Sequence, residues 1–178
     1  MQRSELEHII RACSALTGLT QFVITGNQAL AGQLPDAPDE LVSSLTADLF
    51  CQGDSDATRH IEKSLGENTL FDQTFGYCVR GVDEEEIILP EGWRDRVIPI
   101  ESPDTAGACG YCLEVHDLAV SRLACGKDED FTFLLGLLRY RLIDEGELED
   151  RLTATEMSSS LRADCEGRFA RLIRALTL

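Results

Sequence analysis

The order of two hydrophobic patterns constrains the fold of this chain more than any other feature. Short runs rich in β-forming residues, at 19–25 and 46–51, alternate with helical patterns. The runs FGYCVRGV, EIILP and RVIPI then predict neighbouring strands between about residues 71 and 100. From VHDLAVSRLAC onward, apolar residues recur at helical spacing. We therefore expect an α/β (α+β) fold, in which a short mixed sheet with packed helices precedes a helical C-terminal part.

The length and composition predict one domain. A chain of 178 residues that is 43% hydrophobic can bury a sizeable core, so we expect a single domain over 1–178, with 145–178 as a helical extension. No run approaches the roughly 18 to 20 apolar residues of a membrane span, and MQRSELEHII lacks the pattern of a signal peptide. These observations predict a cytoplasmic protein that does not bind membranes.

The charge argues against nonspecific nucleic-acid binding. The chain has 16 Lys plus Arg and 32 Asp plus Glu, a net charge of −16, and nonspecific binding to phosphates depends on cations. A local cationic pocket is still compatible with this composition. The last helical run carries Arg162, Arg168, Arg171 and Arg174, whose simplest role is to offset acidic neighbours, within the molecule or on a partner.

Local signals predict where several helices begin and end. Ser4 and Glu7 form a plausible capping box for a helix over 4–17. Ser55 and Asp56 are candidate caps of a later helix, which Gly66 is placed to end.

The seven cysteines are predicted to be reduced. Their number is odd, and most lie in apolar stretches, which fits core thiols better than a disulfide framework. The pair Cys109 and Cys112 has the spacing of a redox motif or of half a zinc site. However, it follows a loop rather than opening a helix after an early strand, and no second ligand pair accompanies it. We therefore expect a reduced, metal-free pair.

Residues suited to binding phosphate or a metal ion lie at three of the predicted elements, in an order that suggests phosphate chemistry. They are Gly26 and Asn27 at a helix start after the first strand, Asp48 on the second strand, and Arg122, Lys127 and Asp130 downstream. Backbone N–H groups at a helix start can bind phosphate, a carboxylate on a strand can hold Mg²⁺, and later cations can neutralise a triphosphate. Each feature alone also has a simpler interpretation, as a turn, a cap or a solvated helix face.

Longer runs of the sequence resemble a known family. TGNQALAGQLPDAPDELVSSLTADLF, IEKSLGENTLFDQTFGYCVRGV, ILPEGWRDRVIPI and CLEVHDLAVSRLACGKDEDF, in this order, are similar to an uncharacterised bacterial family of nucleotidyltransferase-fold proteins, distantly related to AbiEii-type toxins. The similarity spans roughly residues 1 to 150. It implies a minimal nucleotidyltransferase fold with a Gly-Ser pair for phosphates, an Asp-x-Asp pair for Mg²⁺, and a later helix with Lys, then Arg five residues on, then Asp.

The resemblance carries over residue by residue, with departures. Gly26 matches the glycine, and Asn27 replaces the serine but can still donate to phosphate. Asp48 matches the first metal-binding carboxylate, whereas Phe50 occupies the position of the second. The downstream cations are exchanged, because Arg122 stands at the lysine and Lys127 at the arginine, with Asp130 in register. A planar guanidinium and a compact ammonium do not substitute freely for each other.

The loss of the second carboxylate predicts an impaired or atypical metal site. Two-metal phosphoryl transfer needs several converging oxygen ligands, which Asp48 beside Phe50 does not supply. Asp54 or Asp56, or the run Asp83 to Glu86, could replace the missing ligand. Their interpretation as ordinary loop and capping residues is favoured, because Asp and Glu are usually exposed.

Two functions follow from these expectations. The first is an enzyme that transfers a nucleoside monophosphate from an NTP to an acceptor hydroxyl, such as that of RNA, with Mg²⁺ as cofactor. The second is a catalytically inactive module that binds a nucleotide, or a protein partner in a defence or toxin-antitoxin pair. The missing second aspartate favours the second function.

Two geometric expectations accompany both functions. Asp48 should face the helix start at Gly26. The downstream helix should break between Cys125 and Lys127, because five residues of straight helix turn about 500° and would point Arg122 and Lys127 in different directions. Together these features predict a pocket bounded by Gly26, Asp48, Arg122 and Lys127.

Overall fold

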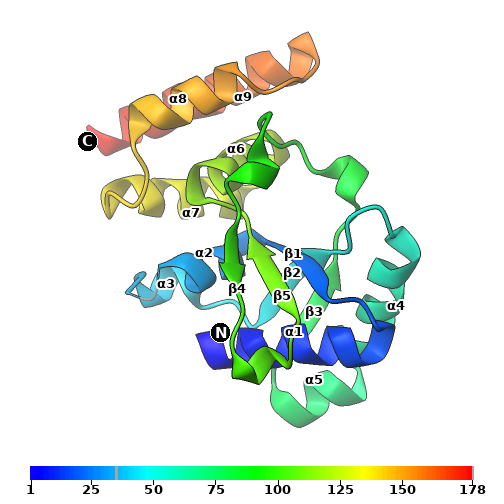
Figure 1. The fold of residues 1–178 in the computed structure, drawn as a ribbon. Coiled ribbons are helices and arrows are strands. Elements are labelled where there is room, and N and C mark those ends of the chain that lie inside the picture. The colour runs from blue at the N-terminus through cyan, green and yellow to red at the C-terminus, as the bar shows by residue number, and fades with distance from the viewer. Residues whose placement is uncertain (35, 178) are drawn as a thin grey trace. The chain divides into compact units, whose positions relative to one another are not determined.

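The computed structural model of the protein describes residues 1–34 and 36–177, which contain a five-stranded mixed sheet and a series of helices (Figure 1). The chain divides into two compact units. The first comprises Met1–Ile87 and Arg96–Glu114, and the second comprises Ile88–Asp95 and Val115–Leu178. None of the helices in the described part of the chain is long and apolar enough to cross a membrane.

The first unit contains the sheet. Its strands are β1 (Gln21–Thr25), β2 (Thr46–Phe50), β3 (Cys78–Gly81), β4 (Ile98–Ile100) and β5 (Cys109–Cys112). They lie in the order β3-β2-β1-β5-β4. β1 pairs antiparallel with β2 and parallel with β5, β2 pairs parallel with β3, and β4 pairs antiparallel with β5. The short mixed sheet predicted from the sequence is thus confirmed.

Helices cover one face of this sheet. They are α1 (Arg3–Thr17), α2 (Gly26–Gln33) and α4 (Ser55–Leu65), accompanied by the short helices α3 (Asp39–Val42) and α5 (Leu70–Phe75). A Cβ added at Gly110 would meet Ile10 of α1, and one added at Gly32 of α2 would meet Cys112. Because Gly110 and Cys112 are two residues apart on one strand, α1 and α2 pack on the same face.

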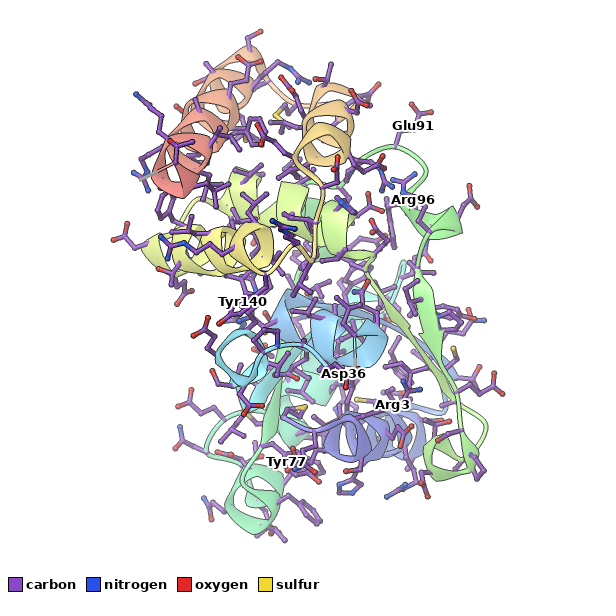
Figure 2. The ribbon with its side chains drawn as sticks, turned by 90° about the vertical axis from the view of Figure 1, so that its left-hand side faces the viewer. Arg3, Asp36, Tyr77, Glu91, Arg96 and Tyr140 are labelled. Atoms are coloured by element: carbon purple, nitrogen blue, oxygen red, sulfur yellow. The ribbon has the colours of Figure 1, made fainter. Side chains whose placement is uncertain are left out.

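The ends of these helices are held by polar contacts that differ in detail from the expected ones. The Glu5 carboxylate accepts a hydrogen bond from the backbone N–H of Gln2 at 2.5 Å, so the predicted box of Ser4 and Glu7 is wrong by two residues. Asp54, rather than Ser55 or Asp56, caps α4 by accepting from the Ala57 N–H. Arg3 donates to the Gly32 carbonyl oxygen at 3.2 Å and ties the start of α1 to α2 (Figure 2).

Two of the strand expectations are corrected. The run EIILP is not a strand, because Glu84–Glu86 form a 3₁₀ turn capped by the Asp83 side chain, and Ile87–Pro90 pair with no strand of the sheet. Conversely, Cys109–Cys112, which was expected to follow a loop and was not expected to be a strand, forms β5. This strand completes the hydrogen bonding of β1, the central strand of the sheet.

The second unit is helical. It contains α6 (Val115–Cys125), α7 (Asp128–Arg139), α8 (Glu145–Thr153), α9 (Ser159–Leu176) and a 3₁₀ turn at Trp93–Asp95. The helical C-terminal part predicted from the sequence is confirmed. α6 and α7 are separated at Gly126, whose φ of 71° lies in the left-handed region and whose N–H donates to the Arg122 carbonyl oxygen. The predicted break between Cys125 and Lys127 is therefore confirmed.

Candidate functional site

The junction between β1 and α2 carries the first group of candidate residues. Gly26 is the first residue of α2 and follows Thr25, the last residue of β1. Its φ is 65°, and an added Cβ would overlap the carboxylate of Asp48 on the neighbouring β2. The predicted arrangement, in which Asp48 faces the helix start, is confirmed. A glycine is required here both by the backbone conformation and by the close approach of Asp48.

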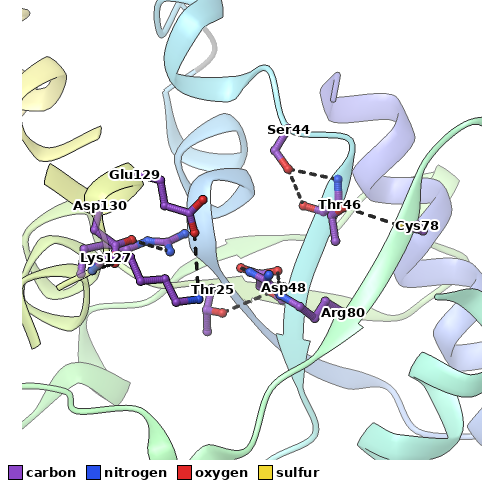
Figure 3. A network of polar contacts seen from close by, with 10 residues as sticks. Thr25, Ser44, Thr46, Asp48, Cys78, Arg80, Lys127, Glu129 and Asp130 are labelled. Atoms are coloured by element: carbon purple, nitrogen blue, oxygen red, sulfur yellow. Dashed lines mark hydrogen bonds and ion pairs between the residues drawn. The ribbon is translucent and has the colours of Figure 1, made fainter. Parts of the chain in front are cut away.

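The Asp48 carboxylate is held by an arginine. Asp48 lies directly opposite Arg80 in the parallel pairing of β2 and β3. Arg80 donates from Nε to Oδ1 at 2.9 Å and from Nη2 to Oδ2 at 2.7 Å (Figure 3). The Asp48 side chain is 10% exposed and that of Arg80 is 52% exposed. The residue expected to bind a metal ion therefore already belongs to a two-pronged ion pair.

Sequence reasoning missed Arg80. The only sequence feature that pointed to it was a single arginine within FGYCVRGV, a run that is predicted to be a strand. Its partner could not be deduced without the register between β2 and β3, which places Arg80 opposite Asp48.

The second metal-ligand position is apolar. Phe50 lies two residues after Asp48 on β2, so its side chain points to the same face of the sheet, and it is only 1% exposed. The alternative carboxylates have other partners. Asp54 caps α4, Asp83 caps the 3₁₀ turn, and Glu84 accepts from the Gly53 N–H at 2.9 Å.

These observations do not fit a magnesium site of the kind the family pattern implies. Asp56 lies in the first turn of α4 with its side chain 90% exposed and paired with Arg59. Among the described residues, no group of three His, Cys, Asp or Glu side chains is arranged to hold a metal ion. Mg²⁺ binding needs several oxygen ligands in near-octahedral geometry, and the Asp48 carboxylate alone provides two that Arg80 already engages.

An acidic cavity of about 530 Å³ lies at the end of β2. Its lining includes Asp54, Glu62 and the residues from Asp83 to Glu86, with Arg59 as a cation. Its volume is that of a small-molecule pocket. Because carboxylates dominate its lining, the cavity repels a triphosphate and does not extend an anion site at Gly26.

The second group of candidates lies in the second unit. Asp130 is 2% exposed and accepts from Arg122 Nη1 at 2.9 Å and from the Lys127 backbone N–H at 3.0 Å. Arg122 is itself largely buried, with its side chain 15% exposed. The Lys127 side chain is 59% exposed, and its ammonium lies 4.0 Å from the Glu129 carboxylate (Figure 3). Asp130 therefore orients Arg122 and fixes the start of α7, while the Lys127 side chain reaches toward solvent.

The predicted site residues thus fall into two groups. Gly26, Asn27, Asp48 and Asp56 belong to the first unit, and Arg122, Lys127 and Asp130 belong to the second. Within the first unit the structure brings Gly26 and Asp48 into contact, with Asn27 next to Gly26 in the first turn of α2. Within the second unit it brings Arg122, Lys127 and Asp130 together.

The cysteines are free thiols. Cys109 and Cys112 lie on β5, and burial raises the pKa of Cys112 to about 12 and also raises the pKa of Cys109. A raised pKa disfavours the thiolate, which is the reactive and metal-binding form. Both shifts act against the reactive form, and a reduced, metal-free pair stays our prediction.

Comparison with known proteins places the chain in a described family. The family model described as "Nucleotidyltransferase of unknown function (DUF6036)" matches residues 4–172. Neither the curated proteins nor the solved structures contain a significant match.

Proposed function

Because the chain belongs to the nucleotidyltransferase family of unknown function DUF6036, we propose that it binds a nucleotide at the start of α2 and does so without a magnesium ion. The observation that carries this proposal is the ion pair between Asp48 and Arg80. This ion pair determines the net charge beside Gly26, where the resemblance described above implies that phosphate and Mg²⁺ bind.

The start of α2 has the features of a phosphate site. The first backbone N–H groups of a helix have no partner within the helix and favour anions. Thr25, at the N-cap, does not cap α2 with its side chain, and its hydroxyl instead donates to the Asp48 carbonyl oxygen at 3.4 Å. Gly26 places no side chain at the helix start, where it is buried against Asp48, and the half-buried Asn27 amide can donate to a phosphate oxygen.

Arg80 supplies positive charge where a metal ion is otherwise required. A lone Asp48 carboxylate beside the helix start would repel a triphosphate. The guanidinium neutralises that carboxylate, and with a side chain half exposed it can also reach a phosphate oxygen. The same pairing occupies the carboxylate of Asp48, which is then not available as a ligand for Mg²⁺. The protein can therefore bind a nucleotide without catalysing a metal-assisted nucleotidyl transfer.

Nucleotide-dependent thermal stability tests this proposal. We expect the Tm to rise with at least one of the four NTPs, and by the same amount in EDTA as in Mg²⁺, since binding to the folded state stabilises it. Asn27→Ala and Arg80→Gln should reduce the shift, whereas Arg59→Ala, which removes an exposed cation of the same unit, should not. A shift that requires Mg²⁺ would contradict the proposal.

A second candidate function is nucleotidyl transfer itself, which the description of the family favours. In that case Asp48 would act as a metal ligand, and Arg122, Lys127 and Asp130 would assist the transfer. Incubation with a labelled NTP and RNA, or with the protein's own hydroxyl groups as acceptors, distinguishes the two candidates. Incorporation of label that EDTA and Asp48→Asn both abolish would favour the enzyme. The partner in a defence or toxin-antitoxin pair would then be the molecule that the enzyme modifies.

A further inference from the structure

A small cavity in the second unit gathers positive charge in an otherwise acidic chain. It has a volume of about 80 Å³ and lies where the end of α6, the start of α7 and the middle of α9 meet. The charged residues of its lining are Arg122, Lys127, Asp128, Asp130, Arg168 and Arg171. Four cations against two carboxylates give this lining a formal charge of +2, whereas the whole chain carries −16.

Arg168 is fixed at one wall of the cavity. Its Nη1 donates to the carbonyl oxygens of Leu123 at 2.7 Å and of Ala124 at 3.1 Å, which are among the last carbonyls of α6. The adjacent Gly126 makes room for it, because a Cβ at that position would overlap the guanidinium. One of the three guanidinium nitrogens serves these carbonyls, and the Cys165 side chain also interacts with Arg168. A guanidinium has five N–H donors, so Arg168 keeps donor capacity for a ligand beyond these contacts.

Arg171 is held at a second wall in a different way. Its guanidinium carbon lies 4.1 Å from the centre of the Phe131 ring, so the arginine is stacked on an aromatic residue of α7. Stacking uses the face of the guanidinium and leaves its in-plane N–H groups available. Among the described residues, no carboxylate forms an ion pair with Arg171, so its charge is not neutralised within the unit.

The acidic residues of the cavity are already engaged or exposed. Asp130 accepts from Arg122 and from the Lys127 N–H, which consumes much of its capacity as an acceptor. Asp128 is exposed at the first position of α7. The Lys127 ammonium and the positive end of the 12-residue helix α7 add to the favourable potential for an anion.

We propose that this cavity binds a phosphate group, with Arg168 and Arg171 as its donors and Lys127 at its mouth. A volume of 80 Å³ lies well below the roughly 300 to 1,000 Å³ of pockets that enclose a small molecule, which suits one tetrahedral oxyanion rather than a whole nucleotide. The group is therefore inorganic phosphate or the terminal phosphate of a nucleotide. Every residue of this site belongs to the second unit, so the inference does not depend on nucleotide binding at α2.

Titration calorimetry of the full chain with inorganic phosphate, ATP and adenosine tests the assignment. We expect phosphate and ATP to bind and adenosine not to bind. Arg171→Ala should weaken binding of phosphate by at least about tenfold, since it removes a charged two-pronged donor. Arg174→Ala is the matched control, because Arg174 lies on the same helix, carries the same charge and is outside the cavity lining. Arg171→Lys should restore part of the affinity.

The outcomes separate the alternatives. Equal phosphate affinity in Arg171→Ala and Arg174→Ala would overturn the site, as would a wild-type chain that binds neither phosphate nor ATP. ATP affinity that exceeds phosphate affinity and falls with Arg171→Ala identifies a nucleotide as the source, and equal affinities identify free phosphate. Asn27→Ala should leave phosphate binding intact, so a failure of the α2 proposal is distinguished from a failure of this one.

Discussion

Arg80 on β3 donates two hydrogen bonds to the carboxylate of Asp48, at 2.9 and 2.7 Å, across a parallel strand pair. Cross-strand neighbours on one face of a sheet interact directly. This contact therefore links the stability of β2 and β3 to the charge beside the start of α2.

Arg80→Ala should destabilise the first unit by about 1 to 2 kcal/mol. The variant leaves the carboxylate of Asp48, which is only 10% exposed, without its partner, but the half-exposed position of Arg80 lets water replace part of the interaction. Urea denaturation measures the effect. Arg59→Ala, which breaks the exposed pair with Asp56, should cost less than about 0.5 kcal/mol. Equal losses in the two variants would contradict a special role for Arg80.

Gly26→Ala should destabilise more than Gly53→Ala. Both glycines have φ near 70°, so in both variants the alanine must adopt the left-handed conformation, which costs about 1 to 2 kcal/mol of stability. Only at Gly26 does the new methyl group also collide with Asp48, whereas nothing lies within 4 Å of a Cβ at Gly53. Thermal or urea unfolding compares the two. A loss at Gly53 as large as that at Gly26 would show that the contact with Asp48 adds no strain.

Asp130→Asn should destabilise the second unit by about 2 kcal/mol. The nearly buried carboxylate accepts from both Arg122 and the Lys127 N–H, and hydrogen bonds to charged groups contribute about 1.5 to 3 kcal/mol. Asp128→Asn, an exposed change in the same helical turn, is the control and should have little effect. Circular dichroism during denaturation follows both variants, and similar midpoints would argue against Asp130 as an anchor of α7.

Stability should fall as the pH drops from about 7 toward 5.5, and His8 should account for part of the loss. Burial, with a smaller contribution from Arg11, lowers the pKa of His8, whose Nδ1 lies 2.7 Å from the Tyr77 hydroxyl. The unfolded chain then binds a proton more readily than the folded one below about pH 6.5, so the contribution of neutral His8 is full above that pH and lost below it. His8→Gln should flatten the dependence of Tm on pH, and a dependence that this variant leaves unchanged would contradict the role of His8.

Native thiol titration should detect about one reactive cysteine. Cys125 is exposed, whereas the other six are buried, and the buried Cys112 has a pKa of about 12. The Ellman reagent should therefore modify Cys125 in the folded chain and all seven thiols in denaturant. Cys125→Ser should remove the native reaction. Rapid modification of Cys109 or Cys112 in the folded chain would instead indicate an accessible redox pair.

The features that could be predicted from the sequence are local ones. The passage from β1 into α2 at Gly26 and the break at Gly126 depend on backbone conformations that glycine adopts at no steric cost. The resemblance implies phosphate binding at Gly26 and Mg²⁺ binding at Asp48, and so predicts that the two residues lie close together. The assignment of Phe50 to the second metal position follows from the Asp-x-Asp pattern of the family that the sequence resembles, and the strand periodicity of two places its side chain on the same face as Asp48.

The features that could not be predicted depend on distant pairing. CGYC becomes a strand because it pairs with the open edge of β1, whereas EIILP pairs with no strand of the sheet. Strand propensity is set largely by such neighbours. The partner of Arg80 could not be predicted either, because it depends on the register between β2 and β3. Likewise, Arg168 and Arg171 come together at the start of α7 only because α7 packs against α9.

The position of β1 also governs the order in which the first unit can form during synthesis. One edge of β1 pairs with β2, which follows within about 25 residues, but the other pairs with β5, in which Cys109 lies opposite Gln21. Until the ribosome has released residue 112, the central strand has an unpaired edge open to other chains. Such long-range closure slows folding, so nascent chains that stop short of β5 are the forms most exposed to aggregation and most dependent on chaperones.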